Sequence, residues 1–534
     1  MGVVGLAASL AIAASATVAF ADTVDRDALE RDLAVLAADN MEGREAGTAA
    51  YERAAGYVAG RFVALGLQPA GDNGTYFQNV PLRRYERAEE GNALAIDGMG
   101  ELELFEDYTI SGTAQQESGR ITAPLVFIGY GLDIPGRDDF AGVDLEGAVA
   151  IRVSGGPEGL NSEESAHFRS TLNQRLSDRG AIGVLLLYTP KLEERYSWER
   201  LKGYAGHSRG SLTWIWPDGR AYSEGPNILA SGSLSPDLSR RMLEGLEFDY
   251  DDIAAIEATP EGRFPSFAVG REVTIEFASN FETINTPNVI GMLPGSDPSV
   301  ADEYVLVTAH LDHVGIDPTE EEGDDEIYNG ALDNATGVAS MIEVARLLSE
   351  DPPRRPVLLI ALTAEEKGLL GSSYNAANPT VPADQVVANV NLDMPIVTYD
   401  FADVVAFGAE RSNLYPQVVA ATQDFGLTLS PDPQPEQRFF VRSDQYSYVQ
   451  RGIPAVYLDL GFANGGEEAQ GIVLENHYHD PSDEIDLIDF AALERFTGVN
   501  HAIARNIADM EDTPAWLADD FFGTTYGGRL IGQE

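Results

Sequence analysis

The sequence predicts an α/β protein with a mainly parallel central sheet flanked by helices. From residue 288 onward, short apolar runs alternate with segments whose apolar residues recur at helical spacing, as in strands joined by crossover helices. Acidic residues and histidines follow several of these runs directly. The predicted strands are NVIGML (288–293), YVLVTA (304–309), VLLIAL (357–362), VVANVNL (386–392), DVVAFG (403–408) and AVYLDL (455–460).

Helical periodicity appears on both sides of these strands. Residues 27–40 and 49–65 come before them, and the second segment stops at Gly66, a common helix terminator. Within the alternating region we expect helices over 337–348 and 414–425, and a long helix over 487–510 to close the domain.

The length of 534 residues is too great for one ordinary core, so we expect more than one domain. Between about 125 and 189, the runs LVFIGYG, AVAIRV and IGVLLLY alternate with turns and one helical piece, STLNQRLSDRGA. This texture predicts a separate β-rich domain without chemistry of its own. The predicted division is a signal peptide (1–21), an N-terminal part of the main domain (22–115), an inserted domain (116–279), the catalytic domain (280–512) and a C-terminal tail (513–534).

The first 21 residues are uncharged and largely apolar, and they end in Ala19-Phe20-Ala21. Small residues at both ends of that triplet are typical of a secretory cleavage site, which we favour over a buried helix or a membrane anchor. The protein is therefore expected to be exported, to the periplasm or the medium. It has no cysteine, so disulfides cannot stabilise it outside the cell.

The formal charge is −51, from 86 acidic and 35 basic residues. Because nucleic acids and anionic membranes are polyanions, this balance argues against both as partners. The acidic run DPTEEEGDDE (317–326) is expected to be a solvated loop rather than a calcium site.

Polar side chains stand where the predicted strands end. In open α/β sheets, ligands bind beyond the carboxyl ends of the strands, so these residues are expected to form one site. They are His310, Asp312 and His313 in HLDHVG, Asp333 in NGALDNATG, Glu365 and Glu366 in TAEEKG, Asp393 in NLDM, and His477, Tyr478, His479 and Asp480 in ENHYHDPSD.

Two histidines with several carboxylates suit Zn²⁺, with Mn²⁺ or Co²⁺ as alternatives. Two ions about 3.5–4 Å apart need a bridging carboxylate and separate ligands on each side. Adjacent glutamates point in different directions, so one can hold metal while its neighbour acts as a general base. The predicted ligands are His310, Asp333, Glu366, Asp393 and His479, with Glu365 as the base.

The motifs AHLDHVG, NGALDNATG, TAEEKGLLGS, NLDM and YHDPSD occur in this order. With them the chain resembles the di-zinc exopeptidase family of secreted bacterial aminopeptidases, plasma glutamate carboxypeptidase and prostate-specific membrane antigen. The stretch from DNMEGREAGT to LQPAG resembles the N-terminal region of bacterial members, and the middle section resembles the protease-associated domain inserted in many of them.

The resemblance implies a role for each matching residue. His310 and Asp393 would bind one zinc ion, Glu366 and His479 the other, and Asp333 would bridge them, with a cis peptide bond before Asn334. Glu365 would be the general base. Asp312 would orient His310 by accepting its second ring N–H, and Tyr478 would help to stabilise the oxyanion.

The predicted function is an exported di-zinc aminopeptidase that acts on peptides with a free N-terminus. A dipeptidase or carboxypeptidase is the alternative, and it would need a cation such as Arg438 or Arg442 to bind a free carboxylate. A glutaminyl cyclase or a non-catalytic binding protein is less favoured, because all five ligands are retained. His313 and His477 are expected near the site or at the surface; Ser443 and Asp444 either line the pocket or cap a helix. Oligomeric state is not predicted.

Overall fold

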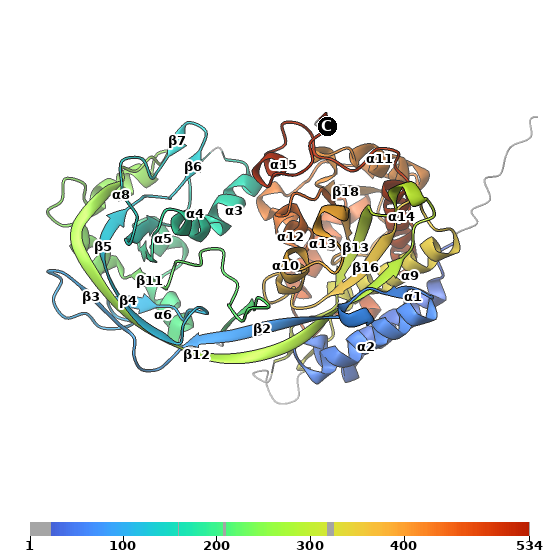
Figure 1. Cartoon of the computed structure of the whole chain (residues 1–534), viewed down its shortest axis with the longest axis horizontal. Helices are drawn as coiled ribbons and strands as arrows, with labels where there is room; N and C mark the ends of the chain where they lie inside the picture. The colour runs from blue at the N-terminus through green and yellow to red at the C-terminus, as the bar shows by residue number, and fades with distance from the viewer. Residues whose placement is uncertain (1–22, 159, 207–209, 318–324, 533–534) are drawn as a thin grey trace, which may run out of the picture.

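The computed structural model describes residues 23–158, 160–206, 210–317 and 325–532. The predicted signal peptide and most of the acidic run lie outside these residues. The chain forms two lobes joined by a pair of long antiparallel strands (Figure 1). These are β2 (Phe77–Arg87) and the 27-residue β12 (Phe267–Leu293).

The larger lobe has the predicted α/β sheet. Its centre is parallel, in the order β16 (Val357–Leu362), β13 (Tyr304–His310), β17 (Val386–Asn391) and β20 (Ala455–Leu460). Antiparallel pairing occurs on either side of this centre, where β12 pairs with β16 and β18 (Asp403–Phe407) pairs with β20. The short β19 (Thr428–Leu429) lies parallel to β18 at the edge. The prediction of a mainly parallel sheet is confirmed for the strands that carry the site residues.

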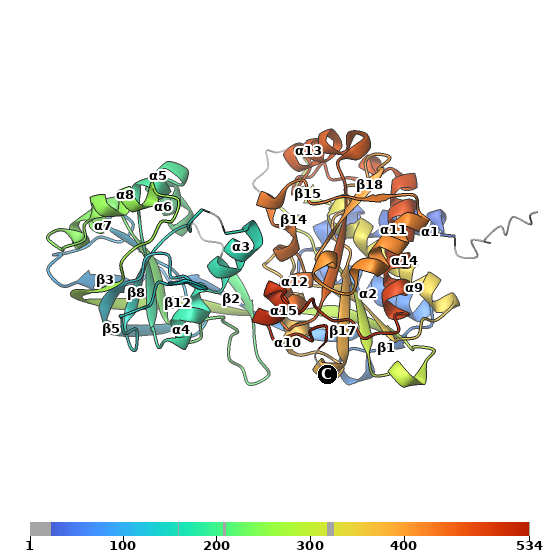
Figure 2. The same ribbon diagram turned by 90° about the horizontal axis from the view of Figure 1, so that it is seen from above.

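Helices cover both faces of this sheet (Figure 2). Successive strand residues alternate between the faces, so Val305 and Val307 pack in one core cluster and Leu306 in another. The first cluster is the larger and lies under helices α1 (Arg26–Leu36), α2 (Ala49–Ala64), α9 (Thr336–Glu350), α11 (Tyr415–Asp424) and α14 (Phe490–Ala508). The second lies near α10 (Leu370–Ala377) and α12 (Gln445–Val449).

The smaller lobe has a sheet and a core of its own. Parallel strands β5 (Ser118–Phe127), β8 (Val149–Val153), β9 (Gly183–Leu187) and β11 (Ala230–Leu234) form its centre. Antiparallel to them run β4 (Tyr108–Ile110) and the first half of β12, and β3 (Ala93–Ile96) in turn pairs antiparallel with β12. This lobe is less β-rich than predicted, because it also contains α3 (Ser162–Ser170), α4 (Leu172–Asp178), α5 (Pro190–Arg195), α6 (Trp198–Gly206), α7 (Pro236–Leu243) and α8 (Tyr250–Glu257).

The two predicted internal boundaries do not coincide with the lobes. Strands β3 and β4 precede residue 116 but pair within the smaller lobe, and β12 runs unbroken through position 279. A strand shared by two sheets keeps its alternating pattern across the junction, so the sequence shows no break there.

The predicted C-terminal tail is packed rather than loose. Trp516 is fully buried, and its indole N–H donates to the carbonyl oxygen of Gly452 at 2.8 Å. Helix α15 (Phe521–Thr525) contacts α3 of the smaller lobe, where the His167 ring lies 5.3 Å from that of Phe521. The tail therefore contributes to the contact between the lobes.

The remaining elements are short, apart from α13. They are β1 (Gln68–Pro69), β6 (Asp133–Ile134), β7 (Arg137–Asp138), β10 (Ser211–Trp214), β14 (Gly315–Ile316), β15 (Ile327–Tyr328) and α13 (Gly466–Asn476), with single turns of 3₁₀ helix between them. None of the helices in the described part of the chain combines the length and apolar character that crossing a bilayer requires.

Candidate metal centre

The predicted ligands converge at the carboxyl ends of the parallel strands. His310 is the last residue of β13, Asp393 follows β17 by two residues, and Glu366 follows β16 by four. Asp333 lies in the turn Ala331–Ala335 that leads into α9, and His479 follows α13. Side chains from five separate segments therefore meet at one edge of the sheet, as predicted.

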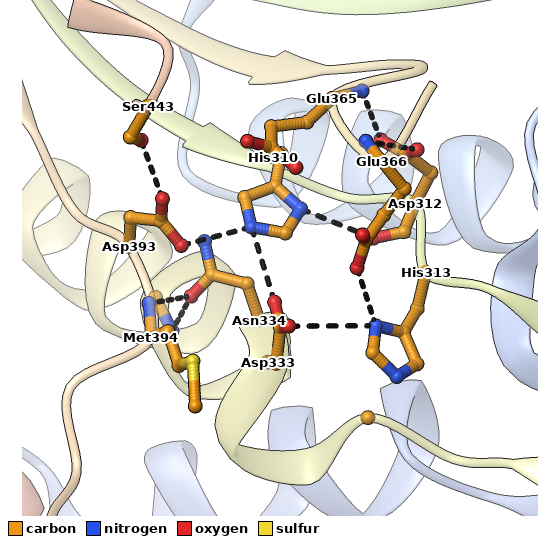
Figure 3. A network of polar contacts seen from close by, with 12 residues as sticks. His310, Asp312, His313, Asp333, Asn334, Glu365, Glu366, Asp393, Met394 and Ser443 are labelled. Carbon is orange, nitrogen blue, oxygen red and sulfur yellow. Dashed lines mark hydrogen bonds and ion pairs between the residues drawn. The ribbon is translucent and has the colours of Figure 1, made fainter. Parts of the chain in front are cut away.

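Asp333 lies at the centre of this group (Figure 3). Its Oδ1 is 3.3 Å from His310 Nε2, and its Oδ2 is 3.2 Å from His479 Nε2. His310 Nε2 is also 2.9 Å from Asp393 Oδ1, and His479 Nε2 is 3.0 Å from Glu366 Oε2. The two oxygens of one carboxylate thus face two separate His–carboxylate pairs.

The donor set fits divalent metal ions. Ligand atoms of His310, Asp333 and Asp393 lie within 4.8 Å of one another, and so do those of His313, Asp333, Glu366 and His479. Imidazole nitrogens and carboxylate oxygens are the ligands that zinc takes in catalytic sites. Buried carboxylates need compensating positive charge, and Asp333 and Asp393 are 4% and 8% exposed.

The titration of the histidines reflects this negative environment. Burial alone would lower the pKa of His310, but the carboxylates of Asp393 and Glu365 outweigh it and raise that pKa well above its usual value. Burial alone would also lower the pKa of His479, but hydrogen bonds to Asp333 and Glu366 raise that pKa to about 10. The site thus strongly attracts cations.

The adjacent glutamates occupy different surroundings. Glu366 faces histidines, with Oε1 2.8 Å from His313 Nδ1 and Oε2 3.0 Å from His479 Nε2. Glu365 lines the cavity beside the site. Burial, followed by the charge of Asp393, raises the pKa of Glu365 well above its usual value, so Glu365 has a high affinity for a proton.

Asp312 makes a different contact from the one predicted. His310 Nδ1 lies 3.1 Å from the backbone carbonyl oxygen of Asp312, not from its carboxylate. The carboxylate instead accepts hydrogen bonds from the backbone N–H groups of Glu365 and Glu366, at 3.1 and 3.3 Å. Asp312 therefore fixes the segment that carries the two glutamates, and its backbone orients His310.

His313 belongs to the site, whereas His477 does not. His313 is fully buried against Glu366 and Asp333, and its buried Nε2 has no hydrogen-bond partner among the described residues. One of its ring nitrogens lies within 4.8 Å of ligand atoms of Asp333, Glu366 and His479, although the five predicted ligands did not include it. The His477 ring contacts the exposed hydroxyl of Ser482 at 2.8 Å.

Two further residues hold the ligand-bearing loops. Arg44, 1% exposed, donates to the backbone carbonyls of Leu36, Leu311, Asn329 and Gly330 at 2.6 to 2.9 Å. The Asp483 carboxylate accepts from the backbone N–H groups of Leu332 and Asp333 at 2.9 and 3.0 Å. Sequence reasoning missed both.

The Asp333–Asn334 peptide bond is cis, as predicted. The Asn334 side chain links the neighbouring segments, because its Nδ2 donates to the Leu392 carbonyl and its Oδ1 accepts from the N–H groups of Gly337 and Met394.

A cavity of about 290 Å³ opens beside the site. Tyr478 lines it, 38% exposed, with its ring stacked on that of His479 at 4.0 Å. Ser443 also lines it and donates a hydrogen bond to Asp393. Asp444 does not cap the following helix; it is fully buried, and burial raises its pKa to about 7. Of the two candidate cations, Arg442 lines this cavity and Arg438 does not.

Comparison with known proteins agrees with this geometry. Residues 288–504 match the sequence profile of peptidase family M28. This segment belongs to that family. It contains the six strand ends and all the predicted ligands, so the M28 segment and the candidate metal centre coincide.

Several relatives are similar in sequence to part of this chain. A probable zinc metalloprotease of Pyrenophora teres f. teres is 33% identical over 111 residues, covering 21% of this chain and 23% of the relative. Aminopeptidase Y of Saccharomyces cerevisiae is 28% identical over 262 residues, covering 46% and 43%. Aminopeptidase YwaD of Bacillus subtilis is 27% identical over 231 residues, covering 42% and 45%. Each match spans less than half of the relative's length.

Among solved structures, the aminopeptidase from Aneurinibacillus sp. strain AM-1 aligns with 90% of this chain and 93% of its own, at 19% identity and a TM-score of 0.47.

Proposed function

We propose that the protein is a zinc-dependent aminopeptidase that removes N-terminal residues from peptides. The observation that carries the proposal is the position of Asp333, whose two carboxylate oxygens face His310 on one side and His479 on the other. A bridging carboxylate with one histidine on each side suits a pair of divalent ions. The names of the relatives, aminopeptidases and zinc metalloproteases, support the same assignment.

His310 and Asp393 would hold one ion, Glu366 and His479 the other, and Asp333 both. When bound, the ions would polarise the scissile carbonyl and lower the pKa of a water molecule. Zinc is the proposed metal, with Mn²⁺ or Co²⁺ as alternatives of similar ligand preference.

Glu365 is the proposed general base. It lines the cavity between the ligands and the substrate space, and its raised pKa suits a group that takes a proton from water and passes it to the leaving amine. Tyr478 lines the same cavity, and its hydroxyl is proposed to donate a hydrogen bond to the oxyanion. Asp312 is a positioning residue, because it acts through the backbone of Glu365 and Glu366.

The apolar part of the cavity wall, formed by Met394, Phe439, Tyr457 and Leu474, would receive the side chain of the N-terminal residue. The carboxylates at its base would attract the free amine. A dipeptidase is the second candidate, since Arg442 on the cavity wall offers a partner for a free carboxylate.

The remaining parts of the proposal concern export and domain roles. Residues 1–21 would direct export and be removed, leaving the enzyme in the periplasm or the medium. The smaller lobe would be a protease-associated domain, beginning after β2 rather than at residue 116 and ending within β12 rather than at 279.

The test is release of aniline from leucine anilide by zinc-loaded protein, with N-acetyl-leucine anilide alongside. Cleavage of the free-amine substrate alone, abolished by a chelator, would support the aminopeptidase. Cleavage of neither compound, or of both equally, would count against it.

A further inference from the structure

We propose that Arg442 is a specificity determinant that binds a carboxylate of the substrate. This inference rests on the proposed function, because it names the class of peptide that the same cavity takes. Arg442 is the one arginine or lysine among the residues that line the cavity beside the metal centre.

One edge of the Arg442 guanidinium is free to bind a ligand. Its Nη1 donates to the backbone oxygen and to the side-chain oxygen of Gln437, both at 3.3 Å. Among the described residues, no partner contacts its Nε or Nη2, and no carboxylate pairs with it. An arginine presents N–H donors in a fixed fork that matches the two oxygens of a carboxylate.

The segment that carries Arg442 is fixed in place. On one side, Ser443 accepts from Asn391 Nδ2 at 2.8 Å and donates to Asp393. On the other, Gln445 Nε2 donates to the Phe440 carbonyl at 2.9 Å. Because Ser443 contacts the candidate ligand Asp393 directly, the backbone of the adjacent Arg442 is fixed relative to the candidate metal centre.

The smaller lobe also holds this segment. The Ser162 hydroxyl of α3 donates to the Pro435 carbonyl. The Arg442 guanidinium lies 5.7 Å from the centre of the Phe439 ring, a cavity residue. The cation thus lies beside an apolar residue of the cavity wall, a combination that suits a substrate whose carboxylate is separated from the scissile bond by a hydrocarbon spacer or a second residue.

Two substrate carboxylates have this chemistry. One is the side chain of an N-terminal glutamate, and the other is the C-terminal carboxylate of a dipeptide. Both would make charge-assisted hydrogen bonds with the same guanidinium edge. Peptides that carry neither group near the cleavage site would gain nothing from Arg442.

The test compares wild-type protein with Arg442→Met on leucine anilide, glutamate α-anilide, leucyl-leucine and leucyl-leucine amide. We expect kcat/KM of Arg442→Met to fall at least about tenfold on glutamate anilide or on leucyl-leucine. It should change less than about twofold on leucine anilide and on the amide. The substrate that is affected identifies the source of the carboxylate.

Arg438→Met is the matched control, because Arg438 belongs to the same segment but does not line the cavity. It should alter none of the four rates. Equal losses by Arg442→Met on all four substrates would indicate a structural role, and no loss on any would exclude binding; either result overturns the proposal.

A second measurement does not depend on turnover. The same four compounds are titrated calorimetrically into Glu365→Gln protein, with and without Arg442→Met. A rise of at least about tenfold in the Kd of one carboxylate-bearing compound alone supports the proposal even if no substrate is cleaved and the aminopeptidase assignment fails. An unchanged Kd, or no binding of either carboxylate-bearing compound, overturns it.

Discussion

The guanidinium of Arg44 donates a hydrogen bond of 2.9 Å to the backbone carbonyl of Leu311. Leu311 lies between His310 and Asp312, so this contact fixes the loop that carries one end of the candidate metal centre. The same guanidinium donates to Asn329 and Gly330, which lead to Asp333. One buried side chain from outside the M28 segment therefore joins two ligand-bearing loops.

Replacing Arg44 with Met is expected to weaken zinc binding by about 10–100-fold, the range for partners that orient metal ligands. The substitution would remove the hydrogen bonds that Arg44 donates to four carbonyl oxygens and allow the two loops to move apart. Competition with a chromophoric chelator would measure the zinc affinity. Arg44→Lys keeps the charge with fewer donors and should give an intermediate value; an affinity like that of the wild type in Arg44→Met would contradict the role.

The two adjacent glutamates are expected to respond differently to the same substitution. Glu365→Gln should lower kcat on leucine anilide by about 10²–10⁴-fold while zinc content stays unchanged, because a general base is lost. Glu366→Gln should lose zinc, because this carboxylate faces His313 and His479. Metal analysis after dialysis and steady-state kinetics measure the two effects. Loss of zinc in Glu365→Gln would show that the roles are assigned the wrong way round.

Chelation is expected to lower the thermal unfolding midpoint by several degrees. An ion that binds only the folded state stabilises it by about 4 kcal/mol at a thousand times its Kd. Scanning calorimetry with and without chelator measures the shift. Asp333→Ala should abolish the difference, because its carboxylate faces both His310 and His479. His477→Ala should keep it, since that ring contacts the exposed hydroxyl of Ser482. A shift that survives in full in Asp333→Ala would place the stabilising ions elsewhere.

The contact between the lobes should depend on pH through His167. This ring is 6% exposed and lies 2.9 Å from the Tyr526 hydroxyl and 3.3 Å from that of Tyr446. Burial, with the nearby charge of Arg175, lowers its pKa from 6.5 to about 4. The folded state thus binds the proton less readily than the unfolded state, so stability is full above pH 6.5 and is lost as the pH falls toward 4.

The free energy of unfolding should therefore fall by about 2 kcal/mol more in the wild type than in His167→Gln between pH 7 and pH 5. Urea unfolding at both values measures this difference, and taking it between the two proteins cancels the contribution of other titrating groups. Equal losses in the two proteins would show that His167 titrates normally.

Three of the candidate ligands could be predicted because each lies at or just beyond the end of a short apolar strand, and parallel strands end at the same edge of the sheet. His310, Glu366 and Asp393 are read from local sequence alone. Arg44 could not be found this way: arginine is rarely fully buried, and three of its four carbonyl partners are 267 to 286 positions away. The partner of the Asp312 carboxylate was predicted wrongly. Whether this carboxylate meets the His310 ring or the backbone N–H groups of Glu365 and Glu366 depends on the path of the loop that carries the two glutamates.

The lobe boundaries were hidden for a similar reason. Residues 93–96 and 273–276 pair across the smaller lobe, and such long-range pairing leaves no local mark on composition. His313 was set aside because a histidine beside a ligand has many ordinary roles, and only the fold places it against Glu366.

The most direct measurement is zinc-edge anomalous diffraction from crystals of the zinc-loaded protein. The account predicts two peaks, one on each side of the Asp333 carboxylate, with His310 and Asp393 at the first and Glu366 and His479 at the second. A single peak, or a second ion held by His313 in place of His479, would contradict the assignment.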